Sequence, residues 1–577
     1  MKKTALFIAL SLLAAACTEK PQDVPYELSA NPTVLEFAPE GGSLTVAVES
    51  NGKWATTTAD SWLTVTPSEG EGNATLTVSA PKNETGKALK GTFSVNGPSK
   101  KITVSVTQGV PQNEGPAPVT KITEIKTADD WKTFADLLEA EKYEASETVK
   151  LAADITVTEP IPALTCNFDG QNHTINMTIE EKTPYTADNL KTQCAGVFRK
   201  VVGVTVKNLK TAGSITSCPP DNENGTDYTY YIGGICGWAE GSAVIDGCTN
   251  GINITATAFN THHMGGIIGH ALGQVKVVNC TNKGSVGMSR NGKESKASQI
   301  GGICGHCADN ADIDSCTNDG ALTYDGAGTA RMGGIVGYTN NVVNASFKKC
   351  TNNGSIKNDA TGYSTTKWAY VGGITGYYGT PTEGCKVLYD GCVNTGEITS
   401  DTGGTQLRTR LGGIGALAGN SGGTYTYKDC KNTGSITQTN ADNSGARAQL
   451  AGIVAYAEVV ATVVVDGCTN EAEITTNSAS VKYVGMGGII GGGALESSSF
   501  TNVIVGPKTV LTTLPGCAVG LIGGANSAYT TAVSGKVAGK IVAGDTATQA
   551  DGGNFAGMLF GNELGNGSSV TGVSFNQ

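Results

Sequence analysis

Two short motifs recur along most of this chain, and their spacing constrains its fold more than any other feature. One motif places an asparagine two residues after a cysteine and occurs seven times, from DGCTNGINI at 246–254 to DGCTNEAEI at 466–474. The other is a Gly-Gly-Ile run or a close variant, and it starts at residues 233, 265, 301, 333, 372, 412, 451 and 487. A constant core separated by segments of variable length predicts a solenoid whose insertions lie in loops.

Each repeat contains three runs of strand length, which are the Gly-Gly-Ile run, an apolar run before the cysteine, and a run that closes on an aliphatic residue. Three strands per turn predict an all-β protein dominated by a parallel β-helix, to which we assign residues 123–577. Its clearest repeats span 195–491, and its C-terminal coils, 492–577, are degenerate. Apolar residues at helical spacing predict one short helix at about 127–142, which would cap the open edge of the first coil.

Stacked coils bring equivalent residues of neighbouring repeats about 4.8 Å apart. The repeated asparagines therefore predict a structural ladder in which each amide hydrogen-bonds its neighbours where the backbone turns. The ladder comprises Asn250, Asn282, Asn318, Asn352, Asn394, Asn432 and Asn470. The cysteines of the same motif predict an inward file of small side chains, and their parallel Cβ directions favour free thiols over disulfides.

Residues 29–109 alternate apolar and polar side chains in short runs separated by glycine, proline and asparagine turns, which predicts a small antiparallel, immunoglobulin-like sandwich. This segment resembles the BACON family. The matching residues are SNGKW (50–54), SWLTV (61–65), PSEGEG (67–72), Asn83, Gly91 and ITVSVTQ (102–108). The resemblance implies an accessory glycan-binding module, or a spacer of the kind that many members form. We expect Trp54 and Trp62 in its core, and a linker at 110–122.

The N-terminal residues, MKKTALFIALSLLAAAC, combine two lysines, a short apolar run and small residues before Cys17. This pattern predicts a signal peptide over 1–16. The small residues before the cysteine resemble the lipobox of bacterial lipoproteins, which implies a lipid on Cys17 and an anchor linker over 17–28; plain secretion is the alternative. No other segment is apolar enough to span a bilayer, so the lipid would be the only membrane contact. We expect anchoring to the outer membrane with display on the cell surface; a periplasmic orientation is the alternative.

The formal net charge of -11 and the lack of a basic cluster argue against nucleic acid and anionic membranes as partners. We expect no metal and no other cofactor. Only Cys304 and Cys307 have the spacing of a zinc-binding pair, and no second pair converges on them. His262 and His263 are adjacent, so on a strand they would point to opposite faces. The segment 221–227 lacks the distal glutamate of a calcium loop.

Catalysis would need two carboxylates about 5–10 Å apart if the chain cleaved glycosides. The candidates are Asp246, Asp314, Asp390 and Asp466, each two residues before a motif cysteine. Val278, Lys348 and Lys428 lie between them in the stack. Aspartate alternating with lysine is typical of a solvated face, because it avoids like charges on adjacent coils. We therefore assign no catalytic residue.

The candidate ligand surface follows from the apolar residue that precedes each Gly-Gly-Ile run. That residue should point inward, so the residues one and three places earlier should point outward. These outward columns contain aromatic rings and planar donors of the kind that bind glycans. The ligand-binding candidates are Trp368, Tyr370, Arg331, Arg410, Arg408 and His263. A second column, five residues after each start, is either an outward binding stripe or an interior aromatic stack; it contains Trp238, His270, His306, Tyr338 and Tyr377.

The repeats also resemble GLUG-type repeats of bacterial surface proteins. Taken together, these features predict a non-catalytic, lipid-anchored cell-envelope protein, adhesin-like in character. It would bind glycan or another host- or cell-surface ligand on a face of the β-helix. The alternative is a β-helix carbohydrate-active enzyme, either a polysaccharide lyase or a glycosidase.

Overall fold

The computed structural model describes residues 25–110, 120–181, 194–217, 229–257, 261–289, 297–326, 328–360, 365–379, 382–402, 405–419, 422–440, 447–458, 461–477, 484–493, 495, 498–513, 518–525, 532–543 and 569–575. The predicted signal peptide, Cys17 and the segment 221–227 lie outside these residues. None of the helices in the described ranges is long and apolar enough to cross a membrane. The chain divides into two compact units, Met1–Thr120 and Lys121–Gln577, which are described separately.

The N-terminal unit is a sandwich of two sheets with strand orders β1-β3-β7-β5 and β2-β9-β8-β4-β6. Its pairings are antiparallel apart from that of β2 with β9, which is parallel. The strands are β1 (Leu28–Asn31), β2 (Val34–Phe37), β3 (Gly42–Ser50), β4 (Lys53–Thr58), β5 (Thr64–Thr66), β6 (Glu69–Glu71), β7 (Ala74–Ala80), β8 (Leu89–Asn96) and β9 (Lys101–Gln108).

The sandwich core explains its two tryptophans. Trp54 is buried, and its indole N–H donates to the carbonyl of Gly72 at 2.8 Å. Trp62 is half-buried and packs against the core from its edge. A Cβ at Gly70 would overlap the ring of Trp54, and one at Gly91 would crowd the ring of Trp62. These glycines are therefore needed to seat the two rings.

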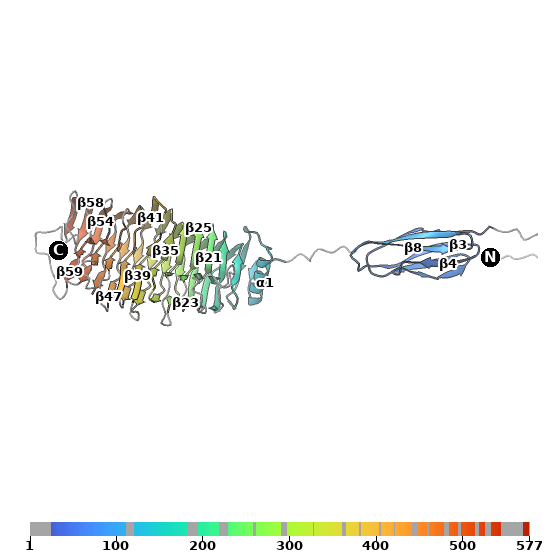
Figure 1. Cartoon of the computed structure of the whole chain (residues 1–577), viewed down its shortest axis with the longest axis horizontal. Helices are drawn as coiled ribbons and strands as arrows, with labels where there is room; N and C mark the ends of the chain where they lie inside the picture. Colours follow the sequence, from blue (N-terminus) through green and yellow to red (C-terminus); the bar gives the residue numbers. More distant parts are fainter. Residues whose placement is uncertain are drawn as a thin grey trace, which may run out of the picture. The chain divides into compact units, whose positions relative to one another are not determined.

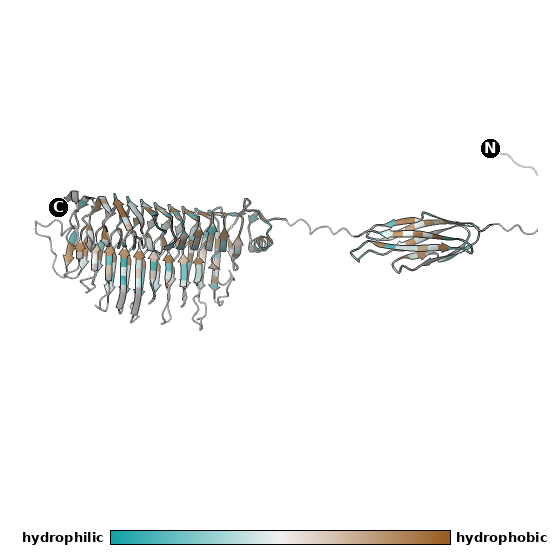
Figure 2. Cartoon of the chain, turned by 45° about the horizontal axis from the view of Figure 1, so that its top comes forward, coloured by the Kyte–Doolittle hydropathy of each residue, from teal (hydrophilic) through white to brown (hydrophobic). Residues whose placement is uncertain are grey.

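The C-terminal unit is a parallel β-solenoid, as predicted, whose coils follow one another along its axis from α1 to β58 and β59 (Figure 1). Each full coil contributes strands to three faces, which we call the ten-stranded, seven-stranded and wide sheets. Among the described residues, the strands of neighbouring coils pair in parallel. Hydrophobic residues recur at equivalent positions from coil to coil (Figure 2). They form one continuous core, because each inward column stacks on itself.

Two of the faces carry the candidate ligand residues. The ten-stranded sheet comprises β16 (Cys194–Ala195), β20 (Thr229–Gly233), β24 (Thr261–Gly265), β29 (Ser298–Gly301), β34 (Ala330–Gly333), β39 (Thr365–Gly372), β44 (Thr405–Gly412), β48 (Arg447–Ala451), β52 (Val484–Gly487) and β56 (Ala518–Gly520). The seven-stranded sheet comprises β13 (Ile161–Leu164), β17 (Phe198–Val202), β21 (Cys236–Gly241), β25 (Ile268–Gly273), β30 (Cys304–Asp309), β35 (Val336–Asn340) and β40 (Thr375–Tyr378). A two-stranded sheet follows, with β53 (Ile490–Gly492) and β57 (Gly523–Ala525).

Within the described ranges the wide sheet has 32 strands, and it carries the cysteine and asparagine motif. Its strands are β10 (Glu124–Ile125), β11 (Thr148–Leu151), β12 (Ile155–Val157), β14 (Asn167–Asp169), β15 (Thr174–Glu181), β18 (Thr205–Lys207), β19 (Lys210–Ser217), β22 (Val244–Asp246), β23 (Thr249–Ala256), β26 (Lys276–Val278), β27 (Thr281–Asn282), β28 (Val286–Met288), β31 (Ala311–Asp314), β32 (Thr317–Asn318), β33 (Leu322–Asp325), β36 (Asn344–Lys348), β37 (Thr351–Asn352), β38 (Ile356–Ala360), β41 (Cys385–Asp390), β42 (Val393–Asn394), β43 (Ile398–Thr402), β45 (Gly423–Lys428), β46 (Lys431–Asn432), β47 (Ile436–Asn440), β49 (Ala461–Asp466), β50 (Thr469–Asn470), β51 (Glu473–Thr476), β54 (Ser499–Val505), β55 (Val510–Thr513), β58 (Ala532–Val537), β59 (Lys540–Ala543) and β60 (Ser569–Phe575).

The helix α1 (Ala128–Glu139) covers the first coil and ends three residues earlier than the sequence predicts. Thr127 caps it, because the Thr127 side chain accepts from the backbone N–H of Asp130 while the Asp130 carboxylate accepts from that of Thr127. The apolar face of the helix is buried in the solenoid core and consists of Trp131, Phe134, Leu137 and Leu138.

The asparagine ladder fixes the register of the coils. Each amide N–H₂ donates one hydrogen bond to the side-chain oxygen of the next asparagine, at 2.8–2.9 Å, and from Asn250 to Asn432 it donates a second to a backbone carbonyl two residues on. Thr211 donates to the first asparagine, and the last donates to Thr509. All seven side chains are fully buried.

The two motifs of the sequence meet at this ladder. In the first seven of the eight runs, the glycine before the isoleucine packs on a ladder asparagine, so that a Cβ at Gly334 would overlap Asn352. The motif cysteines are buried and unbridged, and their thiols lie within reach of backbone carbonyls, as Cys350 does with that of Lys348 at 3.3 Å. Burial raises the pKa of Cys280 and of Cys430 well above the usual thiol value. Close backbone approach explains the glycines, and tight packing explains the small thiol side chains.

Candidate ligand-binding surface

Most of the candidate residues occupy two continuous columns on neighbouring sheets, whereas Trp368 and Arg408 pair with each other two residues before the first column. In the ten-stranded sheet, the register aligns Tyr231, His263, Gln299, Arg331, Tyr370, Arg410 and Gln449. In the seven-stranded sheet, it aligns Trp238, His270, His306, Tyr338 and Tyr377. The apolar residues expected to point inward, from Ile232 to Met486, are buried in the core. The first column therefore points outward.

The two columns touch one another along their length. Tyr231 and Trp238 have ring centroids 4.8 Å apart, and the guanidinium of Arg331 lies 4.6 Å from the ring of Tyr338. Outward side chains at a convex corner would diverge, so these contacts mean that the two sheets meet at a concave corner on the outside of the solenoid. We call the two columns, together with Trp368, Arg408 and Tyr456, which pack against them, the corner strip. The second column is thus neither an interior stack nor a separate stripe.

The N-terminal part of the corner strip contains three histidines that converge. The Nδ1 atom of His306 lies 3.1 Å from the Nδ1 of His270 and 3.1 Å from that of His263. Burial lowers the pKa of His270 to about 4. Burial and the neighbouring His270 and Arg331 lower that of His306 well below its usual range, and His263 is shifted in the same direction for the same leading reason. All three imidazoles are therefore neutral at pH 7.

The C-terminal part of the corner strip consists of arginines stacked on aromatic rings. Arg331 lies over Tyr377 as well as Tyr338, at 4.8 Å. Arg408 lies 4.8 Å from the ring of Trp368. Arg410 lies 3.9 Å from the ring of Tyr456 and 5.5 Å from that of Tyr370, and it pairs with Glu458 at 2.8 Å. These cation–π contacts hold the side chains in defined positions before any ligand arrives.

Exposure separates the candidates that can meet a ligand from those that support them. Tyr370 and Arg410 point outward as predicted, but neighbouring side chains leave them only 1% and 2% exposed. His263, His270 and His306 are also buried under the rings beside them. The half-buried members present edges or faces to solvent; they are Tyr231, Trp238, Arg331, Tyr338, Trp368, Tyr377, Arg408 and Tyr456.

The aspartates considered for catalysis lie on the wide sheet in the expected column. The register pairs Asp314 with Val278 on one side and Lys348 on the other, and Asp466 with Lys428. Asp466 accepts hydrogen bonds from Thr501 and Asn502, and the contact with Asn502, then that with Thr501, lowers the pKa of its carboxyl. A glycosidase acid needs a raised pKa. The pKa of the Asp466 carboxyl is instead lowered.

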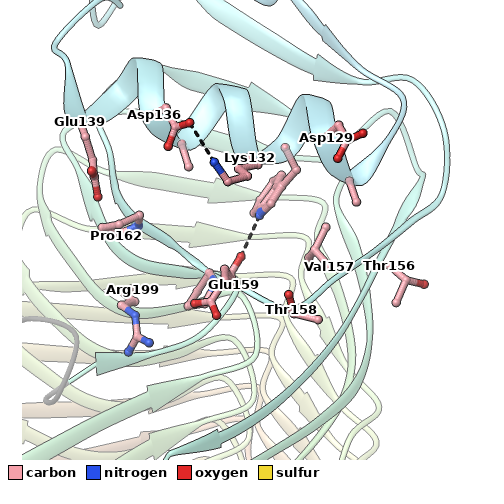
Figure 3. Close-up of a pocket in the computed structure, with 14 residues that line it drawn as sticks. Asp129, Lys132, Asp136, Glu139, Thr156, Val157, Thr158, Glu159, Pro162 and Arg199 are labelled. Atoms are coloured by element: carbon pink, nitrogen blue, oxygen red, sulfur yellow. Dashed lines mark hydrogen bonds and ion pairs between the residues drawn. The ribbon is translucent and has the colours of Figure 1, made fainter.

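A hollow of about 530 Å³ lies between α1 and the first coils (Figure 3). Its wall includes Glu159, whose carbonyl accepts from the indole N–H of Trp131 at 2.9 Å. Arg199 also lines the hollow, and its guanidinium donates to the carbonyl of Cys194 at 2.6 Å. The pair Lys132 and Asp136 lies on the helix above at 3.4 Å. Of these contacts, the hydrogen bond from Trp131 to Glu159 attaches the cap to the solenoid, whereas the other two lie within the helix and within the coils.

Comparison with known proteins identifies the N-terminal unit. Residues 27–111 match the family model of the Viral BACON domain. This match confirms the resemblance seen in the sequence. It does not extend to the solenoid. No curated protein matches the chain.

Two solved structures share limited similarity with the chain. One is a Bacteroides ovatus GH5 xyloglucanase in complex with a XXXG heptasaccharide, at 14% identity and a TM-score of 0.14, covering 35% of this chain and 58% of that one. The other is WR4, a C. elegans MSP family member, at 14% identity and a TM-score of 0.13, covering 14% of this chain and 97% of that one. Likeness at this level carries no argument about function.

Proposed function

We propose that this chain is an exported, lipid-anchored protein of the cell envelope that binds an extended glycan along the corner strip without cleaving it. The observation that carries the proposal is the run of half-buried rings and planar donors on consecutive coils. Rings cover the apolar faces of sugars, and guanidinium and amide groups bond their hydroxyls. The BACON domain would act as a spacer or as an accessory glycan-binding module.

The geometry of the corner strip favours an extended chain over a compact oligosaccharide. Neighbouring coils are about 4.8 Å apart, which is close to the length of one pyranose unit in an extended polysaccharide. A chain lying along the solenoid axis would meet Tyr338, then Tyr377 and Trp368, then Arg408 on successive coils. Because the arginines already stack on these rings, little side-chain freedom would be lost on binding.

Binding to a panel of immobilised neutral and uronic acid-containing polysaccharides tests the proposal. We expect the wild type to be retained by an extended polymer, with no new reducing ends and no unsaturated products. Trp368→Ala should lose retention, whereas Trp62→Ala, in the BACON domain, should keep it. Product formation would instead support the alternative enzyme, and equal retention of Trp368→Ala would exclude the corner strip as the site.

Lipid attachment is tested separately. The intact protein extracted from membranes should have the mass of a chain that begins at Cys17 and carries acyl groups, and Cys17→Ser should move the protein to the soluble fraction. An unmodified Cys17, or a different N-terminus, would remove the anchor from the proposal.

A further inference from the structure

The three converging histidines of the corner strip form a site that glycan binding does not explain. They are the one group of histidine, cysteine, aspartate and glutamate side chains, among the described residues, whose ligand atoms gather within 4.8 Å of one another. Sugar recognition uses rings and hydrogen-bond donors that reach solvent, whereas these three side chains are each less than a tenth exposed. We propose that His263, His270 and His306 bind one Zn²⁺ ion through their Nδ1 atoms.

The spacing of the three Nδ1 atoms fits a metal better than it fits three free imidazoles. Zinc ligated by nitrogen at about 2.0–2.1 Å in a tetrahedral arrangement separates its ligand atoms by about 3.3 Å. The Nδ1 atom of His306 lies 3.1 Å from the Nδ1 atoms of both His263 and His270, and the ligand atoms of all three residues lie within 4.8 Å of one another. Only small side-chain movements are therefore needed to admit the ion, and His306, in the middle, would move least.

Proton counting supports the same conclusion. A neutral imidazole nitrogen either carries a proton and donates, or presents one lone pair and accepts. His306 Nδ1 cannot form a full hydrogen bond with both neighbouring nitrogens, because it has one proton or one lone pair to offer. A metal ion removes this conflict by accepting a lone pair from each of the three nitrogens. The low pKa values of the three groups mean that protons compete weakly for those lone pairs.

The fold holds the three ligands on rigid elements. His263 lies in β24 of the ten-stranded sheet, and His270 and His306 lie in the neighbouring strands β25 and β30 of the seven-stranded sheet. Two rings flank the site, since Trp238 lies 4.4 Å from His270 and Tyr338 lies 4.6 Å from His306. Three protein ligands leave a fourth position for water or for an oxygen of a bound ligand.

The surroundings set the metal class and the strength of binding. Three imidazoles suit zinc, copper and nickel, whereas calcium and magnesium prefer oxygen ligands. The positive charge of Arg331 would repel the ion, because it lies close enough to lower the pKa values of His263 and His306. The Nε2 atom of His306 also has no hydrogen-bond partner within the described part of the chain, so the usual outer support is missing there. We therefore expect weaker binding than in a zinc enzyme.

Metal titration of the full chain tests the site. The protein should carry no polyhistidine tag, since it has five histidines of its own, and it should be freed of metal with a chelator. We expect one Zn²⁺ per chain by calorimetry, a visible absorption band of tetrahedral cobalt when Co²⁺ is used as the probe, and loss of that band on adding Zn²⁺ but not Mg²⁺ or Ca²⁺.

Single substitutions assign the ligands. Loss of one ligand should weaken zinc binding at least about 100-fold, because even outer-shell substitutions cost about 10–100-fold. We expect this for His270→Gln and for His306→Gln, with circular dichroism and thermal unfolding showing that both variants fold. His173→Gln is the matched control, since His173 bonds Asp154 away from the corner strip and its loss should change nothing.

Arg331→Gln provides a test in the opposite direction. Removing the nearby positive charge should tighten zinc binding on the order of tenfold. The proposal is overturned if the wild type takes up no more zinc than His306→Gln. It is also overturned if the uptake survives that substitution and disappears when thiols are alkylated, which would assign the zinc to cysteines.

Discussion

The ring of Tyr231 lies 4.8 Å from the ring of Trp238, although the two residues belong to different sheets and are separated by the Gly-Gly-Ile run. Other residues of the two columns also contact each other along the solenoid, as Arg331 does with Tyr338 and Tyr370 with Tyr377. These contacts join the two columns into one surface. On a flat face these rings and cations would be isolated from one another, whereas in the concave corner they pack together. The corner is therefore where a continuous, preorganised surface can form on this fold.

The ladder predicts that substitutions of two adjacent asparagines, Asn352 and Asn353, change the stability of the protein by very different amounts. Asn352 donates to Asn394 and to the carbonyl of Gly354, and it is fully buried. Asn352→Ala should cost on the order of 1–3 kcal/mol, because buried groups above and below lose their partners. Asn353 is exposed and bonds the carboxylate of Asp319, so Asn353→Ala should change stability far less. Chemical denaturation of both variants measures the difference. Equal stability would mean that the ladder is not structural.

The cysteine file predicts resistance to thiol reagents. The thirteen cysteines among the described residues are all buried and free, and burial leads the rise in the pKa of Cys280. Thiolates are the reactive species, so the native protein should label slowly at these positions and quickly after unfolding. Peptide mass mapping after a short exposure to iodoacetamide checks this. Rapid labelling of Cys316 or Cys350 in the folded protein would contradict the buried file.

Much of the solenoid could be predicted from residue patterns because it depends on local rules. Stacking of equivalent residues follows from the repeat, so the Asn352 ladder and the inward position of Ile232 need only the register. The capping helix follows from its apolar spacing and from Thr127. These features do not depend on how the sheets are angled to one another.

The concave corner could not be predicted, because period-2 alternation gives the side of a strand and not the angle between sheets. The same limit hid the histidine cluster. Strand alternation predicts that the adjacent residues His262 and His263 point to opposite faces. They do, since His262 stacks on Tyr230 while His263 contacts His306. The sequence did contain a usable signal. His270 and His306 share a column on adjacent coils, and His263 lies in the neighbouring column on the same coil as His270.

The buried histidines predict a loss of stability in mild acid in the metal-free protein. The folded-state pKa of His270 is about 4, below its ordinary value of 6.5, so the unfolded chain binds more protons between these values. Stability is then full above about pH 6.5 and falls as the pH drops toward 4. The rings packed against His270 are those of His263 and His306, which are neutral imidazoles, and those of Tyr231 and Trp238.

Thermal unfolding at pH 7.5 and pH 4.5 measures this loss. The shift at His270 corresponds to on the order of 3 kcal/mol over the whole window. His270→Gln should therefore show a smaller acid-induced fall in melting temperature than the wild type, while His173→Gln should behave as the wild type. Identical falls for all three proteins would show that His270 is not buried in its neutral form.

Oxidative footprinting of tryptophan tests most directly whether the corner strip is the ligand-binding surface. Trp238 and Trp368 are half-buried on the strip, Trp62 is half-buried in the BACON domain, and Trp54 and Trp131 are buried controls. The protein would be oxidised briefly, free and with the polysaccharide that retains it best, and each site would be quantified by mass spectrometry. We expect protection of Trp238 and Trp368 with no change at Trp62. Protection of Trp62 alone, or unchanged oxidation of both strip tryptophans in the complex, would contradict this expectation.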